Sequence, residues 1–336
     1  MKICANCFKD EEIKNFIISS SSEITKCDFC NEEDCVIEIE ELYDFFVEFS
    51  ELFCIDENAT INLTDILNNH WNIFSSNDSA NKILTHLYNN GVIKYSPDER
   101  IGYIEELLEC KTIWSKLKEE VSSKSRFFTD ISSFPWESFI QPNFTLKKNT
   151  SLYRARILPD GFDKLSPKDM GCPPPEKTPA GRANPLGIPY LYLCDNKDTT
   201  LYETRSVYLD RVCIGTFRTI RDLKLVNFNN LINPFYAFTA SDGNTTLLEA
   251  VKTHIIMEDI SKDLSKPLRR FDTELEYVPT QFICEYCKLN EADGIMFSSS
   301  LHPNGKNVVL FSPTDAKCTK VDCVEVNKVS ITSYKI

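Results

Sequence analysis

One short segment of the chain gathers residue types that could bind and cleave a charged nucleotide. Residues 180–203 read Ala-Gly-Arg-Ala-Asn-Pro-Leu-Gly-Ile-Pro-Tyr-Leu-Tyr-Leu, then a polar turn, then Thr-Thr-Leu-Tyr-Glu. They place Arg182, Asn184, Tyr192 and Glu203 beside glycines and prolines, which favour loops and turns. A fixed cation, a phenol and a carboxylate so close together suit an anionic nucleotide substrate. They are hard to explain as core residues.

A second chemical pattern lies at the amino terminus. Cys4-Ala-Asn-Cys7 and Cys27-Asp-Phe-Cys30 are two C-x2-C pairs separated by 19 residues. Each pair places two thiolates on one knuckle, and two knuckles supply the tetrahedral four-sulfur set that zinc accepts. Four protein ligands leave no open coordination position, so the spacing predicts a structural Zn²⁺ that supplies folding energy to a small segment. Cys35 is an alternative ligand.

The charge of the 336-residue chain is unevenly distributed. Residues 1–140 hold 12 basic and 27 acidic groups, whereas residues 145–220 hold 12 basic and 8 acidic groups. The front of the chain should therefore repel nucleic acid, which disfavours a nucleic-acid partner for the zinc knuckle. We expect a protein contact or a purely structural role there.

The chain has 14 cysteines, and its start, Met-Lys-Ile-Cys, lacks the apolar stretch of an export signal. No apolar run is long enough for a membrane span. These features predict a cytoplasmic protein whose cysteines are metal ligands and buried thiols, not disulfides. Cys284 and Cys287 form a further C-x2-C pair, which we interpret as buried thiols on a helix.

The elements that must position these residues change character near residue 145. Residues 36–135 show the helical apolar period, as in the stripe from Leu42 through Phe45, Phe46 and Phe49 to Phe53, with Thr64 and Ser79 as expected N-caps. From residue 151 onward, short β-like runs alternate with turn signals. The expected strands are 190–193, 212–217, 223–228 and 307–311, and the expected helices are 198–205, 246–260 and 279–289.

A series of motifs runs through about residues 150–316: Tyr153-Arg154, Gly181-Arg182-Ala183-Asn184 with Gly187, Tyr192, Glu203, Tyr277 with Gln281, Gly294-Ile295 before Phe297-Ser298-Ser299, and Asn307 to Phe311. In order and approximate spacing, these motifs resemble those of the RES domain family. The serine of the family is one of Ser298, Ser299 and Ser300, and Ser299 fits best. Residues 36–140 resemble, less specifically, the helical HEPN-like region that precedes RES domains in multidomain proteins.

This resemblance implies an α+β protein. We expect a zinc-ribbon-like knuckle at 1–35, a mostly helical HEPN-like domain at 36–145, and an ADP-ribosyltransferase-like mixed α/β RES domain at 146–336. Many family members are bacterial toxins that destroy NAD⁺ and are paired with an antitoxin. The resemblance thus implies NAD⁺ as substrate, and an antitoxin, a regulatory protein or a second copy of the chain as partners. A HEPN ribonuclease needs an arginine a few residues before a histidine, and neither His70 nor His86 has an arginine upstream, so nuclease activity is not expected.

Roles follow from the resemblance and from the chemistry of NAD⁺ cleavage, which passes through an oxocarbenium-like ribose. Arg154 and Arg182 are expected to bind the phosphates, Tyr192 to pack on nicotinamide or orient the ribose, and Glu203 to stabilise the transition state. Ser299, Asn307, Asn184 and Gly181 complete the expected site. Hydrolysis, phosphorolysis and ADP-ribosyl transfer to a macromolecule remain open. So does a non-enzymatic partner-binding module with a degenerate nucleotide pocket.

Overall fold

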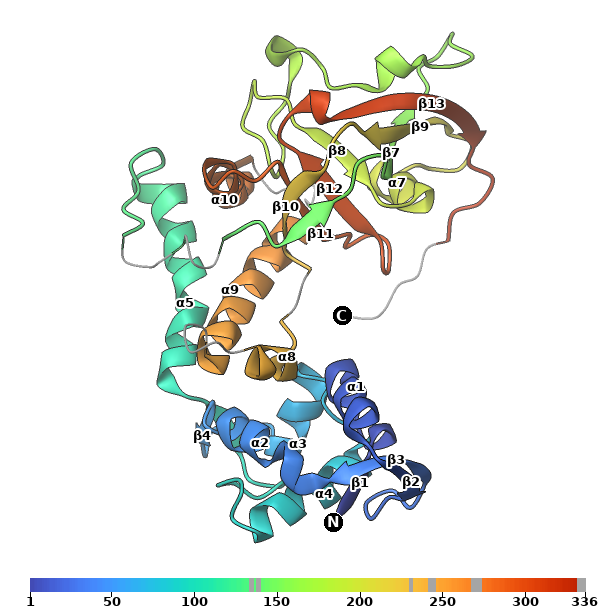
Figure 1. Cartoon of the computed structure of the whole chain (residues 1–336). Coiled ribbons are helices and arrows are strands. Elements are labelled where there is room, and N and C mark those ends of the chain that lie inside the picture. The colour runs from blue at the N-terminus through green and yellow to red at the C-terminus, as the bar shows by residue number, and fades with distance from the viewer. Residues whose placement is uncertain (133–135, 137–139, 230–231, 241–245, 267–273, 331–336) are drawn as a thin grey trace. The chain divides into compact units, whose positions relative to one another are not determined.

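The structure, a computed structural model, describes residues 1–132, 136, 140–229, 232–240, 246–266 and 274–330. The chain forms two compact units (Figure 1). One holds Met1–Thr112 with Ile232–Ile255, and the other holds Ile113–Leu231 with Ile256–Ile336. This division differs from the three expected segments, because the front unit includes a segment from far along the chain.

The front unit begins with a small antiparallel sheet. Strands β1 (Lys2–Cys4), β3 (Glu33–Glu38) and β2 (Glu23–Lys26) lie in the order β1-β3-β2. A 3₁₀ turn, η1 (Ala5–Cys7), follows β1 directly. The next helix, α1 (Glu11–Ser20), starts at Asp10, whose carboxylate accepts hydrogen bonds from the backbone N–H groups of Glu12 and Ile13. An acidic N-cap satisfies donors that the first helical turn leaves unpaired.

The rest of this unit mixes short helices with a two-stranded sheet. Its further elements are η2 (Ile39–Leu42), α2 (Tyr43–Ser50), β4 (Phe53–Ile55), α3 (Leu63–Asp65), η3 (Ile66–His70), α4 (Asn77–Asn89), β5 (Ile101–Tyr103), the start of α5 (Glu105–Glu119), α8 (Pro234–Thr239) and the start of α9 (Leu247–Ser265). The two expected N-caps were wrong. Asn62 caps α3, whereas Thr64 is buried and donates to Asn81, and Ser76 caps α4 by accepting from the N–H of Ser79.

Aromatic packing explains why residues 232–255 belong to the front unit. The ring of Phe235 lies edge-on to Phe45, with 5.1 Å between centroids, and also contacts Phe16. Phe45 in turn stacks on Phe49 at 5.3 Å. The Asn233 amide nitrogen donates to the Asp10 carboxylate at 2.6 Å. The apolar stripe expected at residues 42–53 therefore buries itself partly against a distant segment, and burial of large aromatic rings dominates the energetics of such a core.

The second unit is built on one mixed sheet of eight strands, in the order β13-β9-β7-β8-β12-β11-β10-β6 (Figure 1). Neighbouring strands are antiparallel except for the parallel pair β10–β11. The strands are β6 (Phe144–Leu146), β7 (Ser151–Ile157), β8 (Leu191–Cys194), β9 (Arg211–Thr219), β10 (Leu223–Asn227), β11 (Gly294–Ser298), β12 (Lys306–Leu310) and β13 (Ala316–Glu325). The four expected strands lie within one residue of β8, β9, β10 and β12 at most ends. The mixed α and β fold is confirmed.

Helical segments of this unit are short apart from the ends of α5 and α9 and the whole of α10 (Val278–Leu289). Among the described residues the others are η4 (Glu120–Lys124), η5 (Pro167–Met170), η6 (Pro175–Lys177), α7 (Lys197–Glu203), η7 (Glu274–Tyr277) and η8 (Pro313–Asp315). Helix α7 starts where Asn196 accepts a hydrogen bond from the N–H of Thr199. Because it follows β8 directly, its last residue, Glu203, stays close to the sheet.

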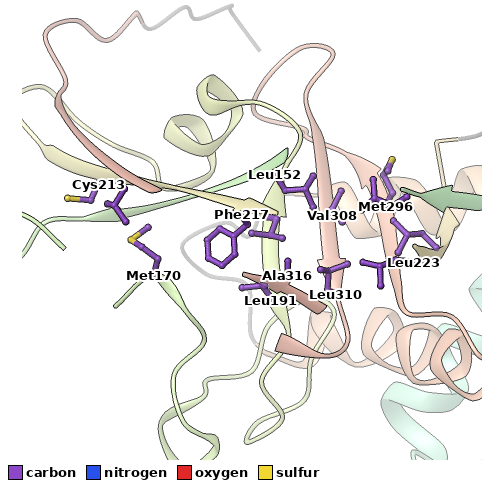
Figure 2. Packing of buried hydrophobic residues seen from close by; sticks show 14 of the residues in the cluster. Leu152, Met170, Leu191, Cys213, Phe217, Leu223, Met296, Val308, Leu310 and Ala316 are labelled. Carbon is purple, nitrogen blue, oxygen red and sulfur yellow. The ribbon is translucent and has the colours of Figure 1, made fainter. Parts of the chain in front are cut away.

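The core lies on both faces of this sheet. Figure 2 shows Leu152, Phe217, Leu191 and Leu310 from four strands grouped with Met170 of η5. On β9 the neighbouring residues Val212 and Ile214 belong instead to a second cluster that includes Leu201 of α7. Successive side chains of a strand point to opposite faces, so β9 is buried on both sides. Helix α7 is thereby fixed against the sheet, which positions its carboxyl end.

One expectation about the cysteines was wrong. Cys213 and Cys323 form a disulfide between β9 and β13, where the two residues are opposed in register. Spacing alone could not reveal this pair, because the residues are 110 positions apart and meet only through strand pairing. Cys284 and Cys287 are buried thiols on α10, and burial raises the pKa of each.

Candidate active site and metal centre

A cleft of about 370 Å³ opens in the second unit at the carboxyl end of α7. Its walls come from β7, the loop at Gly181–Arg182, β8, α7, the end of α9, Tyr277 and the β11–β12 loop. Six of the eight expected site residues line it, namely Arg154, Gly181, Arg182, Tyr192, Glu203 and Asn307. The sheet and its loops thus bring together residues that lie more than 150 positions apart.

The carboxylate of Glu203 is the meeting point of the expected polar residues. Its Oε1 accepts a hydrogen bond from Ser299 Oγ at 2.7 Å and another from Asn307 Nδ2 at 2.8 Å. Asn307 is fixed in turn, because its Oδ1 accepts from Cys194 Sγ at 3.3 Å across the β8–β12 pair. Two donors on one oxygen fix the orientation of an exposed carboxylate at the edge of the cleft.

The β11–β12 loop sets the direction of the Ser299 hydroxyl. Ser299 Oγ accepts hydrogen bonds from the backbone N–H groups of Leu301 and His302, at 3.2 and 3.1 Å. A hydroxyl has one proton, which is therefore left to donate to Glu203. Ser298 donates to Asn229 instead, and Ser300 lines the cleft. Of the three consecutive serines, Ser299 is the one that the structure brings to Glu203.

The Gly181–Asn184 loop is tied to the sheet by Tyr192. The phenol donates to Asn184 Oδ1 at 2.8 Å and accepts from the N–H of Ala183 at 3.0 Å. Burial raises the pKa of this phenol. Asn184 is buried, donates to the carbonyls of Pro179 and Pro185, and does not line the cleft. Both residues thus support the loop, although Tyr192 also lines the cleft.

The shape of this loop requires a glycine at position 181. A Cβ there would lie 2.6 Å from Asn184 Oδ1 and 2.7 Å from the Tyr192 hydroxyl. The loop is also held from α10, where Gln281 Nε2 donates to the carbonyls of Gly181 and Asn184 and Thr280 Oγ1 donates to that of Arg182. These bonds fix the backbone from which the Arg182 side chain enters the cleft.

Basic side chains dominate the charge of the cleft. Besides Arg154 and Arg182, its lining includes Arg205 and Lys266, and Glu203 is the acidic residue among them. Arg205 takes a left-handed backbone angle, φ 50°, just after α7. Arg205 and Lys266 were missed from the sequence. The excess of basic residues over 145–220 in the sequence pointed to Arg205. No sequence pattern pointed to Lys266, which directly follows α9.

Further contacts orient side chains and loops at the cleft. The guanidinium of Arg182 lies over the ring of Tyr277, with 5.4 Å from its carbon to the centroid. Arg154 Nη1 lies 3.9 Å from Cys172 Sγ. His302 bonds Thr199 through Nδ1 at 2.9 Å and stacks on Tyr202, so it supports the loop that carries Ser299.

A group of cysteines placed to hold a metal ion lies in the front unit. The sulfur atoms of Cys4, Cys7, Cys27 and Cys30 all lie within 4.8 Å of one another. Individual Sγ–Sγ distances are 3.4 Å for Cys4–Cys30, 3.6 Å for Cys7–Cys27 and 3.9 Å for Cys4–Cys7. A tetrahedral Zn²⁺ with bonds of about 2.3 Å places its sulfurs about 3.8 Å apart, so this set fits zinc. Cys35 lies on β3, outside the group.

A family model for the RES domain matches residues 151–332. The chain belongs to the RES domain family. The matched residues include every strand of the second unit's sheet from β7 to β13 and all the residues that line the cleft. They also include residues 232–255, which pack in the front unit of this RES protein.

Among solved structures, the crystal structure of the M. tuberculosis MbcT–MbcA toxin–antitoxin complex is similar to this chain. It is 14% identical over 57% of this chain and 91% of that chain, with a TM-score of 0.30. No curated protein matches the chain. Across the described ranges, no helix is at once long and apolar enough to cross a membrane.

Proposed function

We propose that this RES protein consumes NAD⁺ by breaking the bond between nicotinamide and ribose. One observation carries the proposal: Glu203 is held by Ser299 and Asn307 at the edge of a cleft whose other charged lining residues are basic. A single fixed anion among cations matches a substrate with an anionic pyrophosphate at one end and a ribose that becomes cationic at the other.

The reaction requires electrostatic stabilisation of its transition state and little acid–base chemistry. As the C1′–N bond breaks, its electrons leave with nicotinamide, which departs neutral and needs no proton. Positive charge then develops on the ribose, and the carboxylate of Glu203 stabilises it. Because Ser299 and Asn307 already orient that carboxylate, little reorganisation is needed in the transition state.

The opposite end of the substrate is assigned to the guanidinium groups. Arg154 and Arg182 line the cleft from β7 and from the Gly181–Asn184 loop. Planar guanidinium groups match pairs of phosphate oxygens better than ammonium groups do. Arg205 and Lys266 add positive charge to the same cleft, which favours retention of a dianionic pyrophosphate.

Three acceptors for the ADP-ribosyl group are compatible with the proposal. Water, inorganic phosphate or a nucleophile on a macromolecule can each collapse the ribosyl cation, which gives hydrolysis, phosphorolysis or ADP-ribosyl transfer. The proposed roles of Glu203 and the arginines are the same in all three reactions, since each begins with loss of nicotinamide.

The proposed cellular role is that of a cytoplasmic toxin or defence effector that depletes NAD⁺. An antitoxin or regulatory protein would then restrain it, and a second copy of the chain is a further candidate partner. For the front unit the proposal is a HEPN-like helical part and a structural Zn²⁺, and a role in sensing a trigger or driving association. Its acidic composition supports a protein partner in preference to nucleic acid.

The test is to incubate the purified, metal-loaded protein with NAD⁺ labelled in the adenine, with and without phosphate, and to follow products by mass spectrometry. We expect release of nicotinamide by the wild type and none by Glu203→Gln. Free ADP-ribose would indicate hydrolysis, its 1″-phosphate phosphorolysis, and label on a protein or nucleic acid transfer. If wild type and variant both leave NAD⁺ intact while still engaging a partner, the non-enzymatic alternative replaces this proposal.

A further inference from the structure

The guanidinium of Arg182 is held by the carboxyl end of helix α9. Its Nη1 donates a hydrogen bond to the backbone carbonyl of Asp263 at 2.9 Å. Asp263 lies in the last turn of α9. The carbonyl groups of a last turn accept no hydrogen bond from an N–H group of the same helix, so they are open to other donors. A cation at this end also interacts favourably with the helix dipole. The last turn of α9 therefore sets the position of a guanidinium that lines the cleft.

That last turn is itself tied to helix α5. Oδ2 of Asp263 accepts a hydrogen bond from Trp114 Nε1 at 2.6 Å and another from Lys118 Nζ at 2.8 Å. Trp114 is only 2% exposed, and the side chain of Asp263 is about a quarter exposed. The ammonium group also lies 5.8 Å from the centre of the Trp114 ring. Two donors, one from a buried indole, thus anchor a single carboxylate oxygen.

We propose that Asp263 is a positioning residue that sets the substrate-phosphate contact of Arg182 through its carboxylate bonds to Trp114 and Lys118. Helix ends open more readily than helix centres, so an anchored side chain in the last turn keeps the carbonyl that Arg182 uses in place. Trp114 and Lys118 precede residues 151–332, the part that the family model matches. The chain in front of the RES match therefore supplies two of the groups that order its cleft.

This inference rests on the proposed function and refines it at one residue. Arg182 is proposed to hold the pyrophosphate, which keeps its charge from the bound substrate to the transition state. An interaction made equally in both states lowers KM and leaves kcat unchanged. A residue that acts through Arg182 must carry the same kinetic signature, whereas a general loss of folded protein lowers the apparent kcat.

The kinetic test compares Asp263→Ala with Asp259→Ala, which removes a carboxylate one turn earlier on α9 that contacts only Lys262 among the hydrogen bonds described. Asp263→Ala is expected to raise the KM for NAD⁺ about tenfold with kcat changed less than about twofold, in the range of residues that act on a site through a neighbour. Asp263→Asn keeps an acceptor for Trp114 and should restore most of the loss. Asp259→Ala should match the wild type.

The decisive arm repeats Asp263→Ala in an Arg182→Gln background. If Asp263 acts through Arg182, the second substitution adds no further rise in KM, because residues in one network are not additive. An additive tenfold rise, an equal fall in kcat, or the same effect from Asp259→Ala overturns the proposal.

A spectroscopic arm separates this inference from the proposed function. In ¹⁵N-labelled protein, Arg182→Gln should shift the indole N–H resonance of Trp114 and leave those of Trp71 and Trp136 in place. Lys118→Met, a substitution on a partly exposed side chain, should shift the same resonance. If the wild type does not consume NAD⁺ but the Trp114 resonance responds, the proposed function fails and the link stands. If the resonance ignores Arg182→Gln, the link fails whatever the protein does with NAD⁺.

Discussion

The four clustered cysteines of the front unit and the cleft of the RES unit are assembled in opposite ways. The four cysteines lie between positions 4 and 30, and their sulfurs are mostly buried within 4.8 Å of one another. The cleft draws Arg154 from β7, Glu203 from α7 and Asn307 from β12, and Glu203 is exposed. One site is local in sequence and closed, whereas the other is distant in sequence and open.

This difference gives the two sites different roles, one in the stability of the fold and the other in catalysis. A closed four-sulfur site can stabilise the fold but offers no position for a substrate. The open cleft holds a carboxylate whose partners, Ser299 and Asn307, order it without burying it. We therefore expect changes at the cysteines to affect folding first, and changes at the cleft to affect turnover with little effect on folding.

The largest effect is expected from loss of the metal. Cys7→Ser removes one of four sulfurs, and structural Zn²⁺ contributes on the order of 10–16 kcal/mol in small zinc-binding peptides near pH 7. The wild type should contain one Zn²⁺ per chain by mass spectrometry under native conditions, and the variant none. Hydrogen exchange should then accelerate throughout β1, β2 and β3.

Cys35→Ser is the matched control for the metal site. Cys35 lies on β3 beside the cluster but outside it, so this variant should keep its zinc and its exchange protection. Loss of zinc from Cys35→Ser, with retention by Cys7→Ser, would show that the ligand set has been assigned wrongly.

The second prediction concerns the cleft, where we expect a loss of activity without a loss of stability. Glu203→Gln preserves an oxygen that can accept from Ser299 and Asn307 but removes the charge. Nicotinamide release should fall about 10³-fold, the scale for losing one preorganised electrostatic group. Because Glu203 is exposed, the melting temperature should stay within about 2 °C of the wild type.

Asp198→Asn on the same helix is the control for Glu203. Asp198 is an exposed residue in the first turn of α7 and does not line the cleft, so turnover should be unchanged. A similar fall in both variants would mean that the charge of α7, and not the position of Glu203, governs the rate.

The sequence predicted elements of the fold where apolar period and turn signals agreed. Strands β8 to β10 and helix α10 lie almost where expected, because their patterns are local. The packing of Phe235 against Phe45 was not predictable, since both residues look like ordinary core positions and lie 190 residues apart. The disulfide between Cys213 and Cys323 was missed for the same reason.

For the candidate site, residue types were predictable but their partners were not. The motifs pointed to Glu203, Ser299 and Asn307, yet their convergence on one oxygen depends on the β8–β12 register and on the turn after β11. Asn184 shows the converse case. Its place in a motif suggested a substrate contact, whereas the folded loop buries it against Tyr192. Lys266 had no motif at all.

The third prediction tests the rigidity of the Gly181–Asn184 loop, which carries Arg182. Gly181→Ala places a Cβ within 2.7 Å of both Asn184 Oδ1 and the Tyr192 hydroxyl. The loop must shift, which should cost about 1–3 kcal/mol in the free energy of unfolding and raise KM severalfold. Chemical denaturation and steady-state kinetics measure the two effects.

Gly171→Ala is the control for this loop. Its nearest neighbour to an added Cβ is the Lys168 carbonyl oxygen at 3.5 Å, an ordinary contact, and its φ of −71° suits alanine. We expect no loss of stability and no change in KM. A Gly181→Ala protein indistinguishable from Gly171→Ala would show that the loop adapts freely, contrary to its bonds with Tyr192 and Gln281.

The fourth prediction separates two adjacent serines. Ser299→Ala removes one of two donors to Glu203, and a hydrogen bond to a charged group contributes enough that turnover should fall about tenfold. Ser298→Ala removes a bond to Asn229 instead and should change turnover less than about twofold. Both substitutions remove a small hydroxyl, so the two variants should have the same melting temperature. The ratio of their turnover rates then isolates the contact with Glu203. The opposite ratio would move the functional serine to Ser298 and would mean that the β11–β12 loop rearranges when substrate binds.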